Sequence, residues 1–225
     1  MPRQKQSRGS CAYCGKEFAK SGMSKHLATC AGRQAAIAQA NRRPAEKLIH
    51  LQARDAYGGQ FWLNLEMNGS ATLQDLDRYL RAIWLECCGH MSQFSVGGWG
   101  GSEISMKTRI DRVFLPDTQL THIYDFGTES VTLIKFAAVR DGPPLTKHPI
   151  ALMARNAPLD FKCMECEQPA THLCQECQFE DNESGLLCDA HTEGHPHDNY
   201  GEPMPIVNSP RLGMCGYSGP AEPPY

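Results

Sequence analysis

The chain has 225 residues, of which 41% are hydrophobic and 8% aromatic, and eleven are cysteine. This composition supports a core of modest size, and no stretch approaches the ~18 consecutive apolar residues that cross a membrane. The start of the chain lacks the apolar run of a secretory signal. We therefore expect a cytoplasmic protein whose cysteines are reduced thiols, available as metal ligands.

The net charge of −3 is distributed unevenly along the chain. Residues 1–50 carry ten Lys and Arg against two acids, residues 51–155 carry ten against eleven, and residues 156–225 carry two against twelve. The basic beginning could bind nucleic acid, which would repel the acidic end. The alternative is that both ends are solvated charged surfaces without such partners.

The first motif is "CAYCGKEFAKSGMSKHLATC", residues 11–30. A Cys-x2-Cys turn directs two thiolates at one ion, and two ligands four residues apart share one face of a helix. The four ligands of this predicted zinc site are Cys11, Cys14, His26 and Cys30. Phe18 and Met23 are expected to form the small core. The pattern resembles the Cys-Cys-His-Cys relatives of the Cys2His2 finger family, with a ligand interval one residue shorter than usual.

We expect residues 8–33 to form this finger and residues 34–46 a basic linker, with a short solvated helix that ends before Pro44. One finger reads about 3 base pairs, too few for an independent sequence-specific regulator. Any nucleic-acid contact should come from phosphate-binding cations. The candidates are Lys16, Lys20, Lys25, Arg42 and Arg43.

Residues 47–156 are predicted to form a central α+β domain, with a small antiparallel sheet and one main amphipathic helix. Two strand-like runs flank Gly58-Gly59, which is typical of a hairpin. The helix follows, with Thr72 and Asp75 as its capping box. Cys87 and Cys88 are expected to be small packing residues at its end, with a reactive or metal-binding pair as the alternative.

The stretches "YLRAIWLECCGHMSQFSV" and "THIYDFGTESVTLIKF", with the tail "PIVNSPRLGMCGYSG" from Pro205 to Gly219, resemble the Ri-plasmid open-reading-frame-three-like family of transposon passenger proteins. The matching stretch is Ile123-Tyr124-Asp125-Phe126-Gly127, and the resemblance is specific at its last four residues. The resemblance implies an α+β fold and a bacterial or mobile-element setting. It implies no established reaction, and the central serines lack the clustered arginines of a serine recombinase.

His122, Asp125 and Glu129 could form a catalytic group on adjacent strand segments. The competing interpretation is structural: Asp125 before Phe-Gly suits a turn, in which Gly127 would supply the backbone freedom.

The densest chemistry is "CMECEQPATHLCQECQFEDNESGLLCDAHTEGHPHD", residues 163–198. Its candidate ligands fall in four pairs along the chain. Adjacent pairs are too close to surround one ion without strain, so we assign the first and third pairs to one ion and the second and fourth pairs to another. One predicted zinc site is Cys163, Cys166, Cys188 and His191; the other is Cys174, Cys177, His195 and His197. The pattern resembles the B-box zinc finger, with a longer interval between Cys177 and Cys188. His172 and Cys215 are spare candidates.

Four protein ligands close a zinc site, whereas a catalytic zinc keeps an open position. We therefore predict three structural zinc ions, with residues 157–201 as a double zinc module and residues 202–225 as a Pro/Gly-rich tail. The favoured function is an adaptor that contacts a protein partner and, through its basic end, nucleic acid. The alternatives are an enzyme centred on His122 and Asp125, or a direct nucleic-acid binder.

Overall fold

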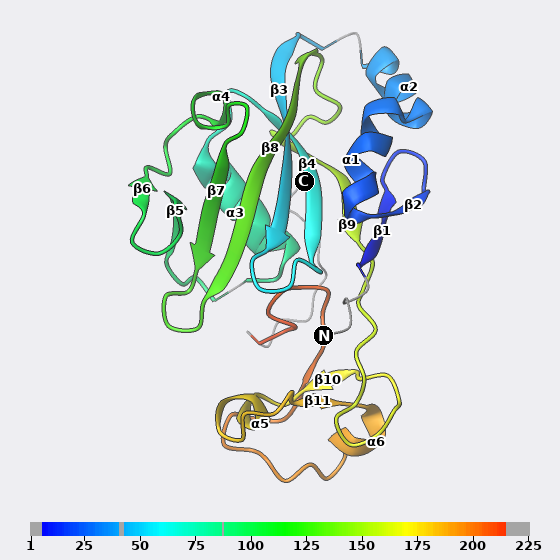
Figure 1. Ribbon diagram of the computed structural model, residues 1–225, viewed down its shortest axis with the longest axis vertical. Coiled ribbons are helices and arrows are strands. Elements are labelled where there is room, and N and C mark those ends of the chain that lie inside the picture. Colours follow the sequence, from blue (N-terminus) through cyan, green and yellow to red (C-terminus); the bar gives the residue numbers. More distant parts are fainter. Residues whose placement is uncertain (1–5, 41–42, 87, 215–225) are drawn as a thin grey trace. The chain divides into compact units, whose positions relative to one another are not determined.

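The computed structural model describes residues 6–40, 43–86 and 88–214 of the chain (Figure 1). The chain divides into two compact units. Unit 1 takes in the described residues up to Leu80 and His90–Ala157, and unit 2 takes in Arg81–Gly89 and the described residues from Pro158 onward. Among the described helices, none is both long and apolar enough to cross a bilayer.

Unit 1 is built on one sheet whose strands are all paired antiparallel, in the order β2-β1-β9-β4-β3-β8-β7-β5-β6. The strands are β1 Arg8–Cys11, β2 Glu17–Ala19, β3 Glu46–Asp55, β4 Trp62–Asn68, β5 Ser92–Val96, β6 Ser102–Ile104, β7 Gln119–Tyr124, β8 Ser130–Gly142 and β9 Ile150–Asn156. The predicted α+β class is confirmed, and β3 and β4 form the hairpin expected around Gly58-Gly59.

Four helices accompany this sheet. They are α1 Lys20–Thr29, α2 Ala31–Gln39, α3 Leu73–Ile83 and α4 Ile110–Val113. The predicted capping box of α3 is confirmed, because the Thr72 amide donates to the Asp75 carboxylate at 2.8 Å and the Asp75 amide donates to Thr72 Oγ1 at 3.3 Å. Helix α3 lies behind the strands in Figure 1. Cys88, expected to pack at the end of this helix, is exposed instead, and Cys87 lies outside the described residues.

The two faces of the sheet differ in chemistry, because successive side chains of a strand point to opposite faces. Leu51 pairs with Leu65, and both side chains are fully buried. The next pair along, Gln52 with Asn64, points the other way, and the Asn64 side chain accepts a hydrogen bond from Ser24 of α1. One face therefore carries the apolar core, and the other carries polar groups that meet helix α1.

The predicted finger is part of unit 1 rather than a module of its own. Strand β1 pairs with β9, so that Gly9 lies opposite Asn156. A Cβ atom at position 9 would lie 2.0 Å from the backbone oxygen of Arg155, so only glycine allows the two strands to approach this closely. The segment foreseen as a linker contains most of α2, whose Arg33 is buried. These contacts bring the N-terminal segment into the central fold.

The regular structure of unit 2 in the described residues from Pro158 onward consists of five short helices and strands. They are β10 His172–Leu173, α5 Gln175–Phe179, β11 Leu186–Leu187, α6 Asp189–Thr192 and β12 Met204–Pro205. Strand β10 lies between β11 and β12. Because β12 belongs to the segment foreseen as a tail, that segment contributes a strand to the zinc module. The buried cluster here consists of Cys174, Cys177 and Leu187, against which Met164 packs.

Candidate metal centres

The N-terminal cluster is assembled from the end of one strand, the turn that follows it, helix α1 and the junction between α1 and α2. Cys11 ends β1, and the turn after it is closed by hydrogen bonds from the Gly15 amide to the Cys11 carbonyl and from the Cys11 amide to the Lys16 carbonyl. Gly15 has a φ of +69°, which glycine adopts readily. His26 comes from α1, and Cys30 links α1 to α2. The turn and the helix thus direct four side chains at one point.

Two ligands of this cluster, Cys11 and Cys30, are part of a buried apolar group in unit 1. The buried residues packed together here are Cys11, Met23, Leu27, Cys30, Trp62, Met153 and Ala154. Phe18 packs against the same group, and its ring stacks on that of His26 with the ring centres 4.2 Å apart. The prediction that Phe18 and Met23 form the finger core is therefore confirmed, although the core extends into β4 and β9.

The other two clusters belong to unit 2 and follow the interleaved assignment. Cys163, Cys166, Cys188 and His191 form one group, and Cys174, Cys177, His195 and His197 form the other. In each of the three clusters found among the described residues, the ligand atoms all lie within 4.8 Å of one another. The structure thus brings together all twelve predicted ligands in the predicted groups of four.

The interatomic distances match those of a tetrahedral ion. Zinc bonds of about 2.3 Å to sulfur and about 2.0 Å to nitrogen put two sulfurs about 3.8 Å apart and a sulfur and a nitrogen about 3.5 Å apart. The Sγ atoms of Cys166 and Cys188 are 3.8 Å apart, and those of Cys11 and Cys30 are 3.9 Å apart. Such spacings are far longer than a disulfide bond of about 2.05 Å.

Sulfur–nitrogen distances support the same geometry. His191 Nδ1 lies 3.5 Å from Cys163 Sγ, 3.5 Å from Cys166 Sγ and 3.2 Å from Cys188 Sγ. His197 Nδ1 lies 3.2 Å from Cys177 Sγ, and His26 Nε2 lies 3.3 Å from Cys14 Sγ. The residues therefore fit three four-coordinate metal ions.

The thiols would change protonation on binding a cation. Burial raises the pKa of Cys11 to about 11. Burial and then the neighbouring Cys174 thiol raise the pKa of Cys177 to about 12. Burial also acts to raise the pKa of Cys163, but backbone hydrogen bonds outweigh it and lower the value to about 6. Because metals bind the thiolate, loading the clusters releases protons from the high-pKa thiols, and acid opposes it.

Two residues outside the ligand sets, Asp181 and His172, lie close to residues of unit 2. The second ring nitrogen of His197, Nε2, lies 3.6 Å from Asp181 Oδ2, an arrangement that orients a metal-binding imidazole. His172 faces Thr171 and Asp189 through its Nδ1 atom, at 2.9 Å and 3.5 Å. It belongs to none of the three clusters, and the other spare candidate, Cys215, lies outside the described residues.

The three residues considered for catalysis engage separate partners. His122 Nε2 lies 2.9 Å from Asp77 Oδ1, with both residues buried. Glu129 accepts hydrogen bonds from the side chains of Tyr57 and Trp99. His122 and Glu129 thus make two separate polar contacts within the fold and do not form one reacting group.

Asp125 forms a turn, as the structural interpretation expected. Its Oδ1 atom accepts hydrogen bonds from the amides of Gly127 and Thr128, at 3.1 Å and 3.3 Å. The expectation that Gly127 supplies the backbone freedom of this turn is wrong, however. Asp125 itself has a φ of +61°, whereas the described positive-φ glycines do not include Gly127. Aspartate tolerates this conformation because its short side chain bonds to the nearby backbone.

The candidate phosphate-binding cations are placed differently from one another. Lys16 is exposed on the turn between β1 and β2, and Lys20 Nζ donates to the Gly59 carbonyl at 2.7 Å. Lys25 is exposed on α1, and Arg43 donates to the Pro144 carbonyl at 3.0 Å. Arg42 lies outside the described residues.

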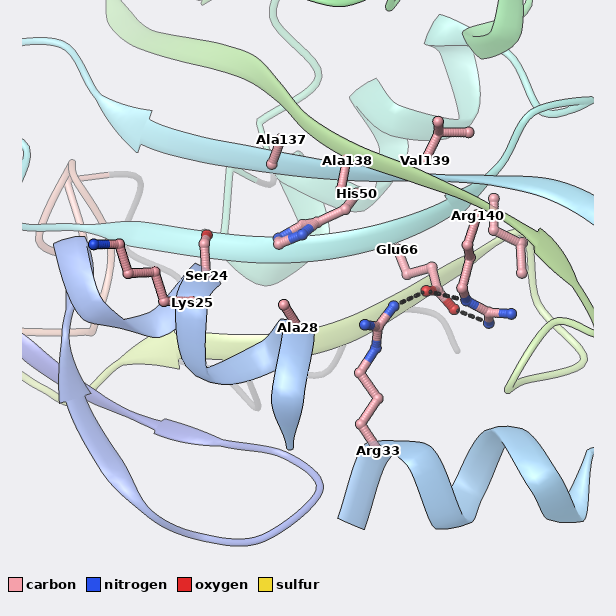
Figure 2. A pocket seen from close by; sticks show the side chains of 11 residues that line it. Ser24, Lys25, Ala28, Arg33, His50, Glu66, Ala137, Ala138, Val139 and Arg140 are labelled. Carbon is pink, nitrogen blue, oxygen red and sulfur yellow. Dashed lines mark hydrogen bonds and ion pairs between the residues drawn. The ribbon is translucent and has the colours of Figure 1, made fainter. Parts of the chain in front are cut away.

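Sequence reasoning missed the buried ion network next to α1 (Figure 2). Glu66 of β4 accepts hydrogen bonds from Arg33 of α2 and from two nitrogens of Arg140 of β8. The three side chains line a cavity of about 340 Å³ together with Ser24 and Lys25 of α1. The sequence offers no local signal for this network, because its members come from three elements far apart along the chain.

Comparison with known proteins does not identify a family. No family model matches the sequence, and no curated protein matches it. Among solved structures, the chain is similar to a protein of unknown function from Methanosarcina mazei Go1, with 18% sequence identity and a TM-score of 0.40. That match covers 46% of this chain and 67% of the other.

Proposed function

We propose that this protein is a zinc-organised adaptor that holds three structural zinc ions. The observation that carries this proposal is the ligand count: each cluster supplies four protein ligands at distances suited to a tetrahedral ion. Three thiolates with one imidazole, or two of each, are typical donor sets of structural zinc. With four protein ligands, the ion has no open position for a reacting water.

Charge separates the roles of the two ends. The first 50 residues have ten Lys and Arg against two acids, so this end attracts the phosphates of nucleic acid. The last 70 residues, 156–225, have two against twelve, so they suit a basic surface on a protein partner. The resemblance to the Ri-plasmid family adds a bacterial or mobile-element setting to the proposal.

Metal analysis of purified protein tests the zinc part. We expect three zinc ions per chain, falling to two in Cys14→Ser. The matched control is Cys88→Ser, because Cys88 is exposed and belongs to none of the clusters. Three ions in both variants, or loss of an ion in the control, would contradict the assignment.

Nucleic-acid retention tests the adaptor part in the full chain. Deleting the finger is unsuitable, because it would strip β1 from β9 and uncover Trp62. Lys16→Glu removes an exposed cation of the finger and Lys107→Glu an exposed cation elsewhere in unit 1. We expect weaker, salt-sensitive retention in the first variant only. Equal, salt-insensitive retention by both would overturn this role.

A further inference from the structure

A second cavity beside helix α1 is lined almost entirely by cationic, amide and apolar groups. It measures about 400 Å³ and shares Ser24 and Lys25 with the cavity of Figure 2. We call it the α1 cleft. Its lining comes from α1, the β3–β4 hairpin, β7 and β8, all in unit 1. Its volume is within the range of sites for small ligands, about 300–1,000 Å³.

The α1 cleft has an excess of positive charge. Its cations are Lys20, Lys25, Arg54 and Lys135, and the described residues that line it include no carboxylate. The neighbouring cavity differs, because Glu66 lies between Arg33 and Arg140 there. In the α1 cleft, the cations have no such counter-charge among the lining residues.

The pKa of Lys20 reflects both its burial and the positive charge of its neighbour Arg54. Burial lowers its pKa, and the charge of Arg54 lowers it further, with the Asp55 carboxylate acting in the opposite direction. Asp55 is occupied by the hairpin: it accepts hydrogen bonds from the amides of Gly58, Gly59 and Phe61. A bound anion would relieve the repulsion between Lys20 and Arg54.

The polar floor of the cleft is fixed by a chain of hydrogen bonds. Gln52 Nε2 donates to Ser24 Oγ, which in turn donates to Asn64 Oδ1 at 3.1 Å. His50 Nε2 lies 2.8 Å from the same Asn64 oxygen. Asn64 is 1% exposed, so this network holds α1 at a set position over the sheet. The helix from which Lys20 and Lys25 extend is therefore held over the sheet before any ligand binds.

We propose that the α1 cleft binds a phosphate ester of nucleotide size. Because four cations and no carboxylate line the cleft, it favours a ligand with more than one negative charge. A phosphoryl group carries such a charge in a compact form. Leu133 and Ala53 offer apolar contacts for the organic part, and Gln119 offers amide groups. The phosphate could belong to a free small molecule or to the end of a nucleic-acid strand.

Calorimetric titration of the zinc-loaded full chain tests this site. The probes are adenosine monophosphate, a short single strand with and without a 5′-phosphate, and citrate as a carboxylate control. We expect saturable binding of a phosphate monoester, weakened about tenfold or more in Lys25→Gln and in Lys135→Gln. Both lysines are exposed at the cleft, so the variants should fold, which circular dichroism checks. Lys107→Gln, outside the cleft, is the matched control.

The outcomes are distinct. Equal affinity for the mononucleotide and the phosphorylated strand assigns a free small ligand, and tighter binding of the phosphorylated strand assigns a strand end. No saturable binding of any phosphate probe, equal binding of citrate, or equal weakening by Lys107→Gln overturns the proposal. Three zinc ions per chain would still support the zinc-organised adaptor, so the two proposals fail separately.

Discussion

Arg33 Nη2 lies 2.6 Å from Glu66 Oε2, with both side chains at most 10% exposed. This ion pair joins helix α2, which follows the metal cluster, to the middle of the sheet. Arg140 donates to the same carboxylate through Nε at 2.8 Å and Nη2 at 2.5 Å. One buried carboxylate thus pairs with two guanidinium groups, and it links α2 of the N-terminal segment to β4 and β8.

Glu66→Gln should strongly destabilise the fold. The amide cannot balance the charges of Arg33 and Arg140, and an uncompensated buried charge costs about 3–5 kcal/mol. Urea unfolding of the zinc-loaded protein measures the loss. Asp141→Asn, which removes an exposed carboxylate of β8, should change the free energy of unfolding by less than about 0.5 kcal/mol. A similar small change in both variants would show that the network contributes little.

The same carboxylate should make stability fall in acid. Burial raises the pKa of Glu66, but the hydrogen bonds and charges of Arg140 and then of Arg33 outweigh it and hold the pKa below its usual value of 4.5. A lowered pKa stabilises the fold above the unfolded value, and this stability is lost as the pH falls from 4.5 through the folded pKa. Metal release in acid affects wild type and Glu66→Gln alike. The stability difference between them should therefore shrink below pH 4.5; a constant difference would contradict this assignment.

Asp181→Asn should weaken one metal site without removing a ligand. The Asp181 carboxylate lies 3.6 Å from His197 Nε2, and loss of such an orienting partner lowers metal affinity about 10–100-fold. Competition with a chromophoric chelator should therefore release one of the three ions earlier. Asp160→Asn, an exposed acid of the same unit, controls for the lost negative charge. Identical release curves for the two variants would mean that Asp181 does not support the site.

Asp125→Ala and Asp125→Asn should separate a turn from a reacting group. Alanine removes the acceptor for Gly127 and Thr128 and tolerates the positive φ poorly, so we expect a loss of about 1–2 kcal/mol. Asparagine keeps the acceptor and favours this backbone conformation, so its stability should stay within about 0.5 kcal/mol of wild type. Thermal unfolding measures both. Equal stability of the two variants would rule out a role for the side chain in the turn.

The metal ligands could be predicted from sequence because their information is local. Cys-x2-Cys spacing fixes each knuckle within a few residues, and the shortness of unit 2 leaves few ways to group four pairs. The α3 cap was equally local, since Thr72 and Asp75 lie three residues apart. In each case the interacting groups were already neighbours along the chain.

The features that could not be predicted from the sequence depend on contacts between residues far apart along the chain. The pairing of Gly9 with Asn156 extends the sheet into the finger, and nothing near either residue indicates the other. The sequence gives no sign that Arg33 is buried, because its partner Glu66 is 33 residues away. The α1 cleft likewise arises only when α1 is laid over the polar face of the sheet. Local pattern could predict the metal sites but not the surface on which a ligand would bind.

Proteolysis of the chelated protein tests the central claim most directly. Among the described residues from 158 to 214, Leu173 and Leu187 are the buried apolar residues other than cysteines, so bound metal should supply most of the stability of this segment. After treatment with a strong chelator in reducing buffer, we predict rapid cleavage throughout residues 158–214, while the sheet of unit 1 stays resistant. If residues 158–214 remain as resistant as in the zinc-loaded protein, metal does not organise this unit and the account is wrong.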